Sequence, residues 1–148
     1  MDLMSVSPEG QQILKEANQI AIKLRRDSVD TRDLLEALTK PDTSIGRTIL
    51  QKLGIPWSNV ENLLFSLAVD GDATNKGTLP LSPHVERVIQ GAIDEARNTW
   101  VTFAQPQHLF LGTAGEPDGT GGAILQKVGV QLPESRRVVA SLTHDAFL

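Results

Sequence analysis

Apolar residues in the first part of the chain recur every three or four positions, which is the period of an α-helix with one buried face. They are Ile13, Leu14, Ala17, Ile20, Ala21 and Leu24. Ser7 and Pro8 precede this stripe, and a serine followed by proline at the first helical position is typical of a helix start. The pattern therefore predicts a long helix that begins at Ser7 and ends before Asp27 and Ser28, where the stripe stops.

Three shorter helices are predicted before residue 70. Each consists of a capping residue followed by aliphatic residues at helical spacing. Their expected starts are Thr31, Ser44 and Ser58, and a turn at 40–42 separates the first two. Gly54 follows the helix that starts at Ser44, at a position where a glycine in the left-handed conformation commonly ends a helix.

The chain repeats itself at an offset of 75 positions. Residues 7–67 align with 82–142 without an insertion, and the segment 49–55 falls on the closely similar segment 124–130. A self-match of this length indicates two copies of one supersecondary unit, related by a pseudo-twofold axis. Residues 70–81 between the copies have little apolar content and are interpreted as a flexible linker.

The second copy is expected to repeat the plan of the first. Its predicted helices start at Ser82 and span 106–111, 124–128 and 135–142. A glycine-rich turn is expected over 116–122, an interhelical connection over 100–104, and Gly129 is the counterpart of Gly54. The sequence thus predicts an all-α fold of eight helices, two four-helix halves in one domain over residues 1–148.

Composition narrows the classes of function. The 148 residues are 40% hydrophobic but only 4% aromatic, so the core is expected to consist mainly of aliphatic side chains. The formal net charge is −4, without a basic field, so we expect no nucleic-acid partner. No stretch approaches the ~20 apolar residues of a membrane span, and the N-terminus lacks a basic and apolar secretion signal. Because there is also no cysteine, we expect a cytoplasmic protein.

Sequence motifs for catalysis or metal binding are missing. The spacing of His84, His108 and His144 does not suit helical metal ligands, and each is interpreted as a surface histidine. The glycines of 112–122 lack the Gly-Lys-Ser/Thr ending of a phosphate loop. We therefore expect no metal, no cofactor and no enzymatic activity, and we expect function in paired grooves or at the seam between the copies. An enzyme with an unrecognised site is the alternative that a deep pocket with convergent polar groups would favour.

Several segments of the second copy carry a resemblance to a known family. They are the opening 81–89 with Ala92 and 95–97, the segment 107–112, and the third-helix ending in 123–125 and 128–130. Together with the tandem Ser-Pro openings, these segments resemble the double Clp repeat domain, which is the N-terminal domain of Hsp100/Clp unfoldases. The resemblance covers about residues 7–142.

This resemblance implies a module that binds substrates or adaptor proteins and passes them to an ATP-driven unfolding ring. The implied partners are Clp-type ATPase or protease subunits, adaptor proteins or substrate polypeptides. Two alternatives stay open: a free-standing accessory subunit that docks on a Clp protease complex, and a regulatory helical domain with an unrelated partner.

The chain departs from the family at one functional motif. Some family members bind phosphoarginine through the acid of a Thr-Glu-His motif in each copy. Arg32 and Gln107 stand at the two matching positions. An arginine repels a guanidinium and a neutral glutamine offers it no charge pairing, so phosphoarginine is expected to bind weakly or not at all.

The candidate protein-binding surface lies at the starts of the helices. Its residues are Ser7, Thr31, Arg32, Ser82, Gln107 and His108. Helix starts leave backbone N–H groups unpaired, and these could receive a partner's carboxylate or carbonyl oxygens. Charge reversal at Arg32 is then expected to weaken partner capture and to leave the melting temperature nearly unchanged. The alternative is that the six residues only cap and solvate the helices.

Overall fold

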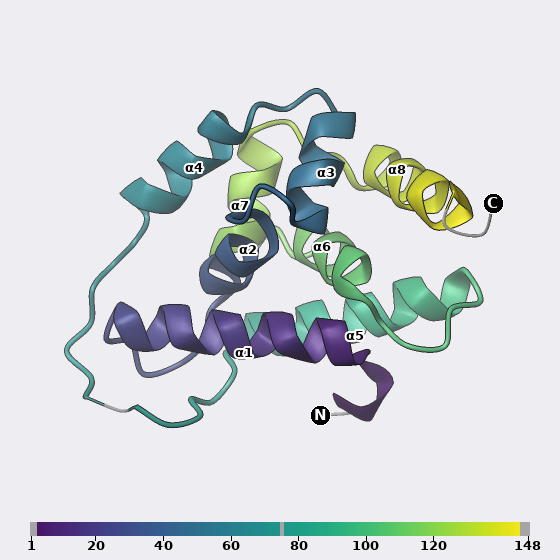
Figure 1. Cartoon of the computed structure of the whole chain (residues 1–148). Coiled ribbons are helices and arrows are strands. Elements are labelled where there is room, and N and C mark those ends of the chain that lie inside the picture. Colours follow the sequence, from purple (N-terminus) through teal and green to yellow (C-terminus); the bar gives the residue numbers. More distant parts are fainter. Residues whose placement is uncertain (1–2, 75, 146–148) are drawn as a thin grey trace.

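The computed structural model describes residues 3–74 and 76–145, and these form a short 3-10 turn and eight α-helices (Figure 1). The bounds are η1 Leu3–Ser5, α1 Pro8–Lys23, α2 Thr31–Thr39, α3 Ile45–Lys52, α4 Trp57–Ser66, α5 Pro83–Asn98, α6 Pro106–Ala114, α7 Thr120–Lys127 and α8 Leu132–Asp145. The prediction of an all-α, eight-helix fold is confirmed. None of the helices in the described residues is long and apolar enough to cross a membrane.

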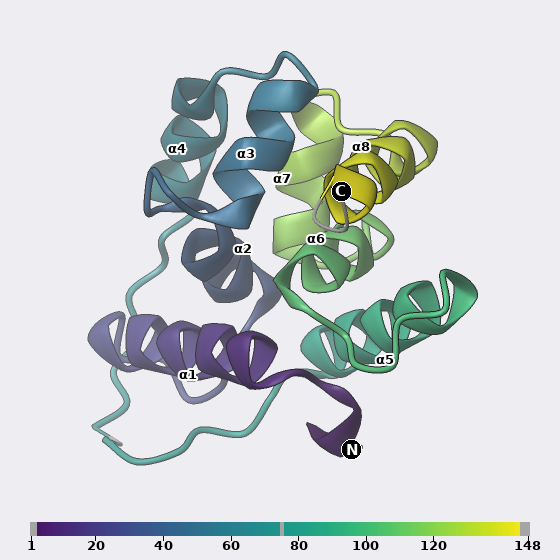
Figure 2. The same cartoon turned by 45° about the vertical axis from the view of Figure 1, so that its right-hand side comes forward.

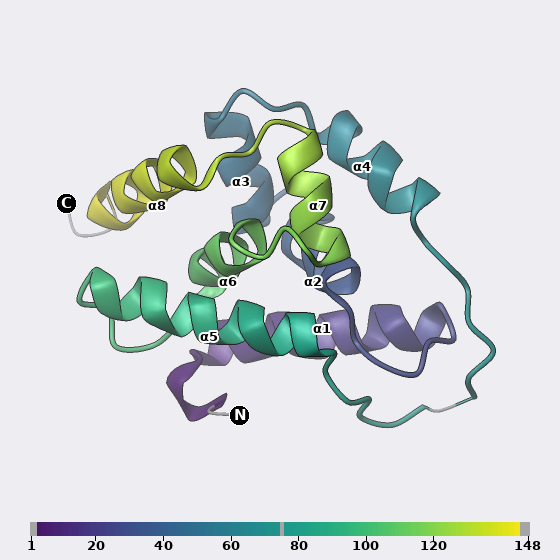
Figure 3. The ribbon, with the colours of Figure 1, turned by 180° about the vertical axis from the view of Figure 1, so that it is seen from behind.

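The helices are arranged around two central ones. α2 and α6 lie in the middle, α1 and α5 run along one edge, and α4 and α8 lie on opposite sides (Figures 1 and 3). α1 packs mainly on α2 and α5 mainly on α6, while α2 also contacts α6 and α7 of the other half. The view in Figure 2 shows α3 and α7 side by side above this centre.

The two halves are related as the sequence repeat predicts. Each helix of the first half has a counterpart in the second that begins 75 residues later. The short extended segments before α1 and α5 cross over: Val6 forms a parallel bridge with Ala104, and Leu81 forms one with Val29. Val6 and Leu81 are repeat equivalents, as are Val29 and Ala104, so the contact is self-complementary, as a twofold axis requires.

Aliphatic side chains from both halves form one core. Equivalent positions are buried in pairs: Ala17 with Ala92, Leu34 with Leu109, and Leu50 with Leu125. Full burial of a leucine stabilises a fold by roughly 2 kcal/mol, so the repeated stripes account for why both halves fold alike.

Several helix boundaries of the predicted pattern are wrong. α4 begins at Trp57 rather than Ser58, α6 extends to Ala114, α7 begins at Thr120 rather than 124, and α8 begins at Leu132 rather than 135. The glycines at the start of α7 suggested a turn because glycine is a poor helix former. Their backbone lies so close to other backbone atoms that a Cβ would not fit, so packing overrides propensity there.

Gly54 and Gly129 end α3 and α7 in the left-handed conformation, with φ of 76° and 101°. This confirms the predicted helix terminators. Two further residues, Arg25 and Trp100, also have positive φ, of 57° and 64°, and they too are repeat equivalents. The sequence did not predict them because neither is a glycine.

The linker between the copies is anchored to the first half rather than free along its length. Gly71 and Ala73 donate backbone hydrogen bonds to the end of α1. The Asn18 side chain donates to Gly77 O and accepts from Leu79 N, at 3.2 and 2.8 Å. Leu79 is buried, so these stretches of the segment interpreted as a flexible linker pack on the first half.

Candidate functional site: helix starts and a groove at the seam

The two serines of the candidate surface cap the long helices. Ser7 Oγ accepts from Gly10 N at 3.0 Å, and Ser82 Oγ accepts from Val85 N at 3.2 Å. Each hydroxyl therefore occupies one of the N–H groups that the sequence analysis assigned to a partner. Ser7 is buried, whereas Ser82 is half-buried.

Thr31 caps a helix of the other half rather than its own. α2 begins after Asp30, and Thr31 is its first residue. The fully buried Thr31 Oγ1 accepts from Gly121 N at 2.8 Å, which supplies a cap to α7 that its own N-cap residue, Gly119, cannot provide. The expectation that Thr31 caps the second helix is wrong, because Asp30 is the N-cap residue of α2 and the Thr31 hydroxyl accepts from α7 instead.

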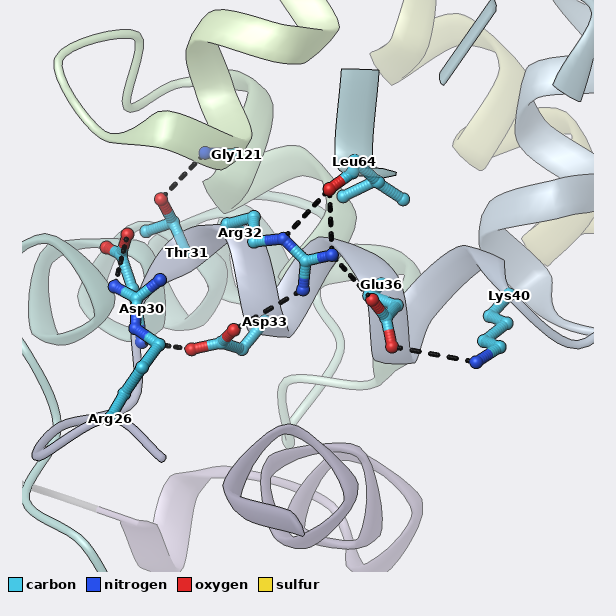
Figure 4. Close-up of polar contacts among 9 residues, drawn as sticks. All are labelled: Arg26, Asp30, Thr31, Arg32, Asp33, Glu36, Lys40, Leu64 and Gly121. Atoms are coloured by element: carbon cyan, nitrogen blue, oxygen red, sulfur yellow. Dashed lines mark hydrogen bonds and ion pairs between the residues drawn. The ribbon is translucent and has the colours of Figure 1, made fainter. Parts of the chain in front are cut away.

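Arg32 is buried, with 3% of its surface exposed, and it joins α2 to the end of α4 (Figure 4). Its Nε and Nη2 donate to Leu64 O at 3.2 and 2.8 Å. Nη2 also pairs with Glu36 Oε1 at 2.9 Å, and Nη1 lies 3.6 Å from Asp33 Oδ1. The expectation of a solvent-facing Arg32 is wrong, because its guanidinium is used inside the chain.

Asp33 completes this buried cluster. Its Oδ2 accepts from Asp30 N at 2.9 Å, which closes a capping box at the start of α2. Burial raises the pKa of Asp33, against the hydrogen bond from Asp30 N and the charges of Arg26 and Arg32, which lower it. Among the described residues, Asp33 Oδ1 and Arg32 Nη1 have no hydrogen-bond partner, and the ion pair between them offsets part of the cost of burying them.

His108 is the repeat equivalent of Asp33 and has the same capping role. Its Nδ1 accepts from Gln105 N at 3.0 Å, and only 2% of the residue is exposed. The interpretation of His108 as a surface histidine is wrong. His84 is partly exposed beside Glu116 and Arg87, and the side chain of His144 lies outside the described residues.

Gln107 is half-buried, and within 3–74 and 76–145 its side chain donates one hydrogen bond, to the side chain of Gln105, at 3.4 Å. It stands where Arg32 stands in the first half. Of the six candidate residues, Ser82 and Gln107 therefore keep partly exposed side chains, and the other four are buried.

The buried state of His108 predicts a pH dependence of stability. Burial lowers the pKa of His108 from its ordinary 6.5, against the carboxylate of Glu95, which raises it. Because the unfolded chain takes up this proton first, the free energy of unfolding is expected to fall as the pH drops below about 6.5. Chemical denaturation at a series of pH values measures this loss. His108→Asn keeps an acceptor for Gln105 N but does not titrate, so it should lose less stability; an equal loss in both proteins contradicts the assignment.

An apolar groove of about 560 Å³ lies between α1 and the segments that precede α1 and α5. The leucines that line it are Leu3, Leu14, Leu79 and Leu81. Exposed polar residues of α1, among them Gln12 and Gln19, line it as well. The groove meets the seam between the copies. The sequence pattern placed Leu14 on the buried stripe of the first helix and did not indicate a groove there; the two leucines in the otherwise polar linker, Leu79 and Leu81, were the available signal.

Metal binding has no support in the described part of the chain. No group of three or more histidine, cysteine, aspartate or glutamate residues there could hold a metal ion. The chemical capacity of the site therefore lies in its apolar groove and partly exposed helix starts.

Comparison with known proteins identifies the family. The Clp repeat (R) N-terminal domain family matches residues 5–128 and, in a second match, 80–146. The chain therefore belongs to this family, which confirms the resemblance drawn from the repeat.

The similar proteins include ClpC and ClpB proteins and solved N-domains of Clp proteins. The chain is 27% identical over 132 residues to the negative regulator of genetic competence ClpC/MecB of Bacillus subtilis and 25% identical to the chaperone protein ClpB of Oceanobacillus iheyensis. These matches cover 89% of this chain but only 16% of either relative. The N-domain of ClpV from Vibrio cholerae has the same fold, with a TM-score of 0.79, 16% identity, and coverage of 97% of this chain and 87% of that one. The N-terminal domain of ClpD from Arabidopsis thaliana matches with a TM-score of 0.70, 18% identity and 97% coverage of both.

Proposed function

We propose that this chain is a protein-binding module that recruits polypeptide segments, substrates or adaptors, to a Clp/Hsp100 unfolding or proteolysis machine. Membership of the Clp repeat family supports the class of function. The observation that carries the proposal is the leucine-lined groove at the seam.

The groove suits apolar side chains of a polypeptide. Its volume of about 560 Å³ is in the range of ligand sites. Four leucines give it an apolar surface, and the two charged residues that line it, Lys15 and Glu16, are of opposite sign. Glutamine side chains along α1 offer hydrogen bonds to a peptide backbone without selecting a sequence. A structural neighbour, the ClpV N-domain, has been solved in complex with a VipB peptide; it has a TM-score of 0.69 and 14% identity to this chain, and covers 86% of it.

The six candidate residues at the helix starts have two different roles in this proposal. Ser82 and Gln107 keep partly exposed side chains and are proposed to contact a partner directly. Ser7, Thr31, Arg32 and His108 hold the helices in place through the hydrogen bonds described above.

The test is binding of fluorescein-labelled casein, an acidic unfolded polypeptide, followed by anisotropy. The double variant Gln12→Arg, Gln19→Arg places two long side chains over the groove on exposed positions of α1. We expect it to bind casein about tenfold more weakly, which is ~1.4 kcal/mol. The added positive charge favours an acidic ligand, so weaker binding reports on the groove.

The matched control is Gln51→Arg, Gln126→Arg, two exposed glutamines on α3 and α7 that do not line the groove. It carries the same charge change and is expected to bind casein as the unaltered protein does. Equal affinity of the groove variant and the control would overturn the assignment to the groove, and no binding by the unaltered protein would overturn the proposed function.

A further inference from the structure

The two halves differ in what covers the turn that follows each long helix. Arg25 after α1 and Trp100 after α5 are repeat equivalents with nearly the same positive φ, 57° and 64°. Trp100 is 96% exposed. A tryptophan that is almost entirely exposed is unusual, because large aromatic side chains are normally buried or held in an interface.

In the first half an extended segment of the linker covers this turn. Gly71 N donates to Leu24 O at 2.8 Å, and Ala73 N donates to Arg25 O at 2.9 Å. These are carbonyl groups that the end of α1 leaves without helical partners. A Cβ at residue 71 would collide with Arg25 O, so the close approach requires glycine there.

In the second half the equivalent carbonyl oxygens, those of Thr99 and Trp100, accept no hydrogen bond from any residue within 3–74 and 76–145. Two more exposed apolar side chains lie in the connection between α5 and α6 and in η1. Phe103 is 48% exposed and Met4 is 86% exposed, and their segments are joined by a hydrogen bond from Ala104 N to Ser5 O at 2.8 Å.

We propose that the turn between α5 and α6 is a docking site for an extended segment of a partner protein, bound as residues 71–73 are bound in the first half. Two backbone N–H groups of the partner donate to Thr99 O and Trp100 O, and its side chains pack on Trp100 and Phe103. This inference rests on the proposed protein-binding function and adds a second surface to it.

The side chains at the two turns indicate which residues a bound segment should have. Asp70 and Asp72 of the linker line one pocket with Arg25 and Arg26 in the first half. The repeat equivalents of these arginines are Trp100 and Val101, which are apolar. A segment that fits the second half therefore has a central glycine, like Gly71, with apolar residues in place of the two aspartates.

The probe for this site is a capped peptide with the sequence of residues 67–74 in which Asp70→Leu and Asp72→Leu have been made, with two lysines appended for solubility. In the variant Trp57→Phe, Trp100 is the only tryptophan. We expect the peptide to shift the Trp100 emission to the blue in a saturable way. The same peptide N-methylated at its glycine lacks one donor and should bind about tenfold more weakly.

The affinity for a fluorescein-labelled form of the peptide is then measured for variants at Trp100 and compared with that of the unaltered protein. Trp100→Arg installs the residue that the first half accepts in this conformation, and Trp100→Gly is a second variant suited to positive φ. Both should keep the fold by circular dichroism and bind at least about tenfold more weakly, since tryptophan is a common hot-spot residue. The groove variant Gln12→Arg, Gln19→Arg should bind this peptide normally, which separates failure at this site from failure of the groove.

Three results would overturn the proposal. The first is unchanged affinity in Trp100→Arg. The second is no emission shift at millimolar peptide. The third is a blue emission in the free protein: if it depends on protein concentration the occupant is a second copy, and if it does not the chain itself covers Trp100.

Discussion

Replacement of Arg32 by methionine is expected to lower the free energy of unfolding by about 3 kcal/mol or more. Methionine fills a similar space but leaves the buried Asp33, the half-buried Glu36 and Leu64 O without their shared partner. Removing one member of a buried ion pair typically costs 3–5 kcal/mol, because the remaining charge is uncompensated. Urea denaturation monitored by circular dichroism measures the change.

The control for Arg32 is its repeat equivalent. Gln107→Met makes the same new side chain at a half-buried position with one weak hydrogen bond, and it should stay within about 0.5 kcal/mol. Arg32→Lys should fall between the two, because a lysine cannot make the paired Nε and Nη2 bonds to Leu64 O. An unchanged melting temperature in Arg32→Met would contradict the structural role and restore the sequence-based view of an exposed Arg32.

Gly121→Ala is expected to destabilise the protein by about 2 kcal/mol, against what helix propensity predicts. Alanine in a helix is favoured over glycine by ~1 kcal/mol. A Cβ at residue 121, however, would lie well inside the contact distance of Thr31 O. α7 would have to move away from α2, which strains the packing between the halves and weakens the Thr31 Oγ1 bond to Gly121 N.

Gly91→Ala is the matched control for this prediction. Gly91 is also inside a helix, α5, but its Cβ would make only an ordinary contact, 3.6 Å from Gly112 Cα. Propensity should then dominate and stabilise the protein by up to about 1 kcal/mol. Thermal denaturation of the two variants should give shifts of opposite sign, and shifts of the same sign would show that the α2–α7 approach is not limiting.

Some of these residues have roles that follow from their sequence neighbours, and others have roles that depend on tertiary contacts. Ser7 and Ser82 were recognised as helix starts because a cap, the following proline and the apolar stripe lie within a few residues of one another. Arg32 and Gln107 have equivalent places in the repeat, yet only Arg32 is buried. Arg32 pairs with the neighbouring carboxylates of Asp33 and Glu36, where the second half has His108 and Leu111. Its remaining partner, Leu64 O in α4, lies 32 positions away, and no pattern around residue 32 reports it.

The sequence by itself determined the fold: helices have a short period, their caps are local, and a second copy at an offset of 75 residues repeats both signals. Only the tertiary structure decided where solvent reaches. The crossing of Val6 with Ala104 and of Leu81 with Val29 brings both halves together and opens the groove beside α1. Thr31 is buried against Gly121, which lies 90 positions further along the chain, so the use of its hydroxyl follows from a long-range contact rather than from its neighbours in sequence.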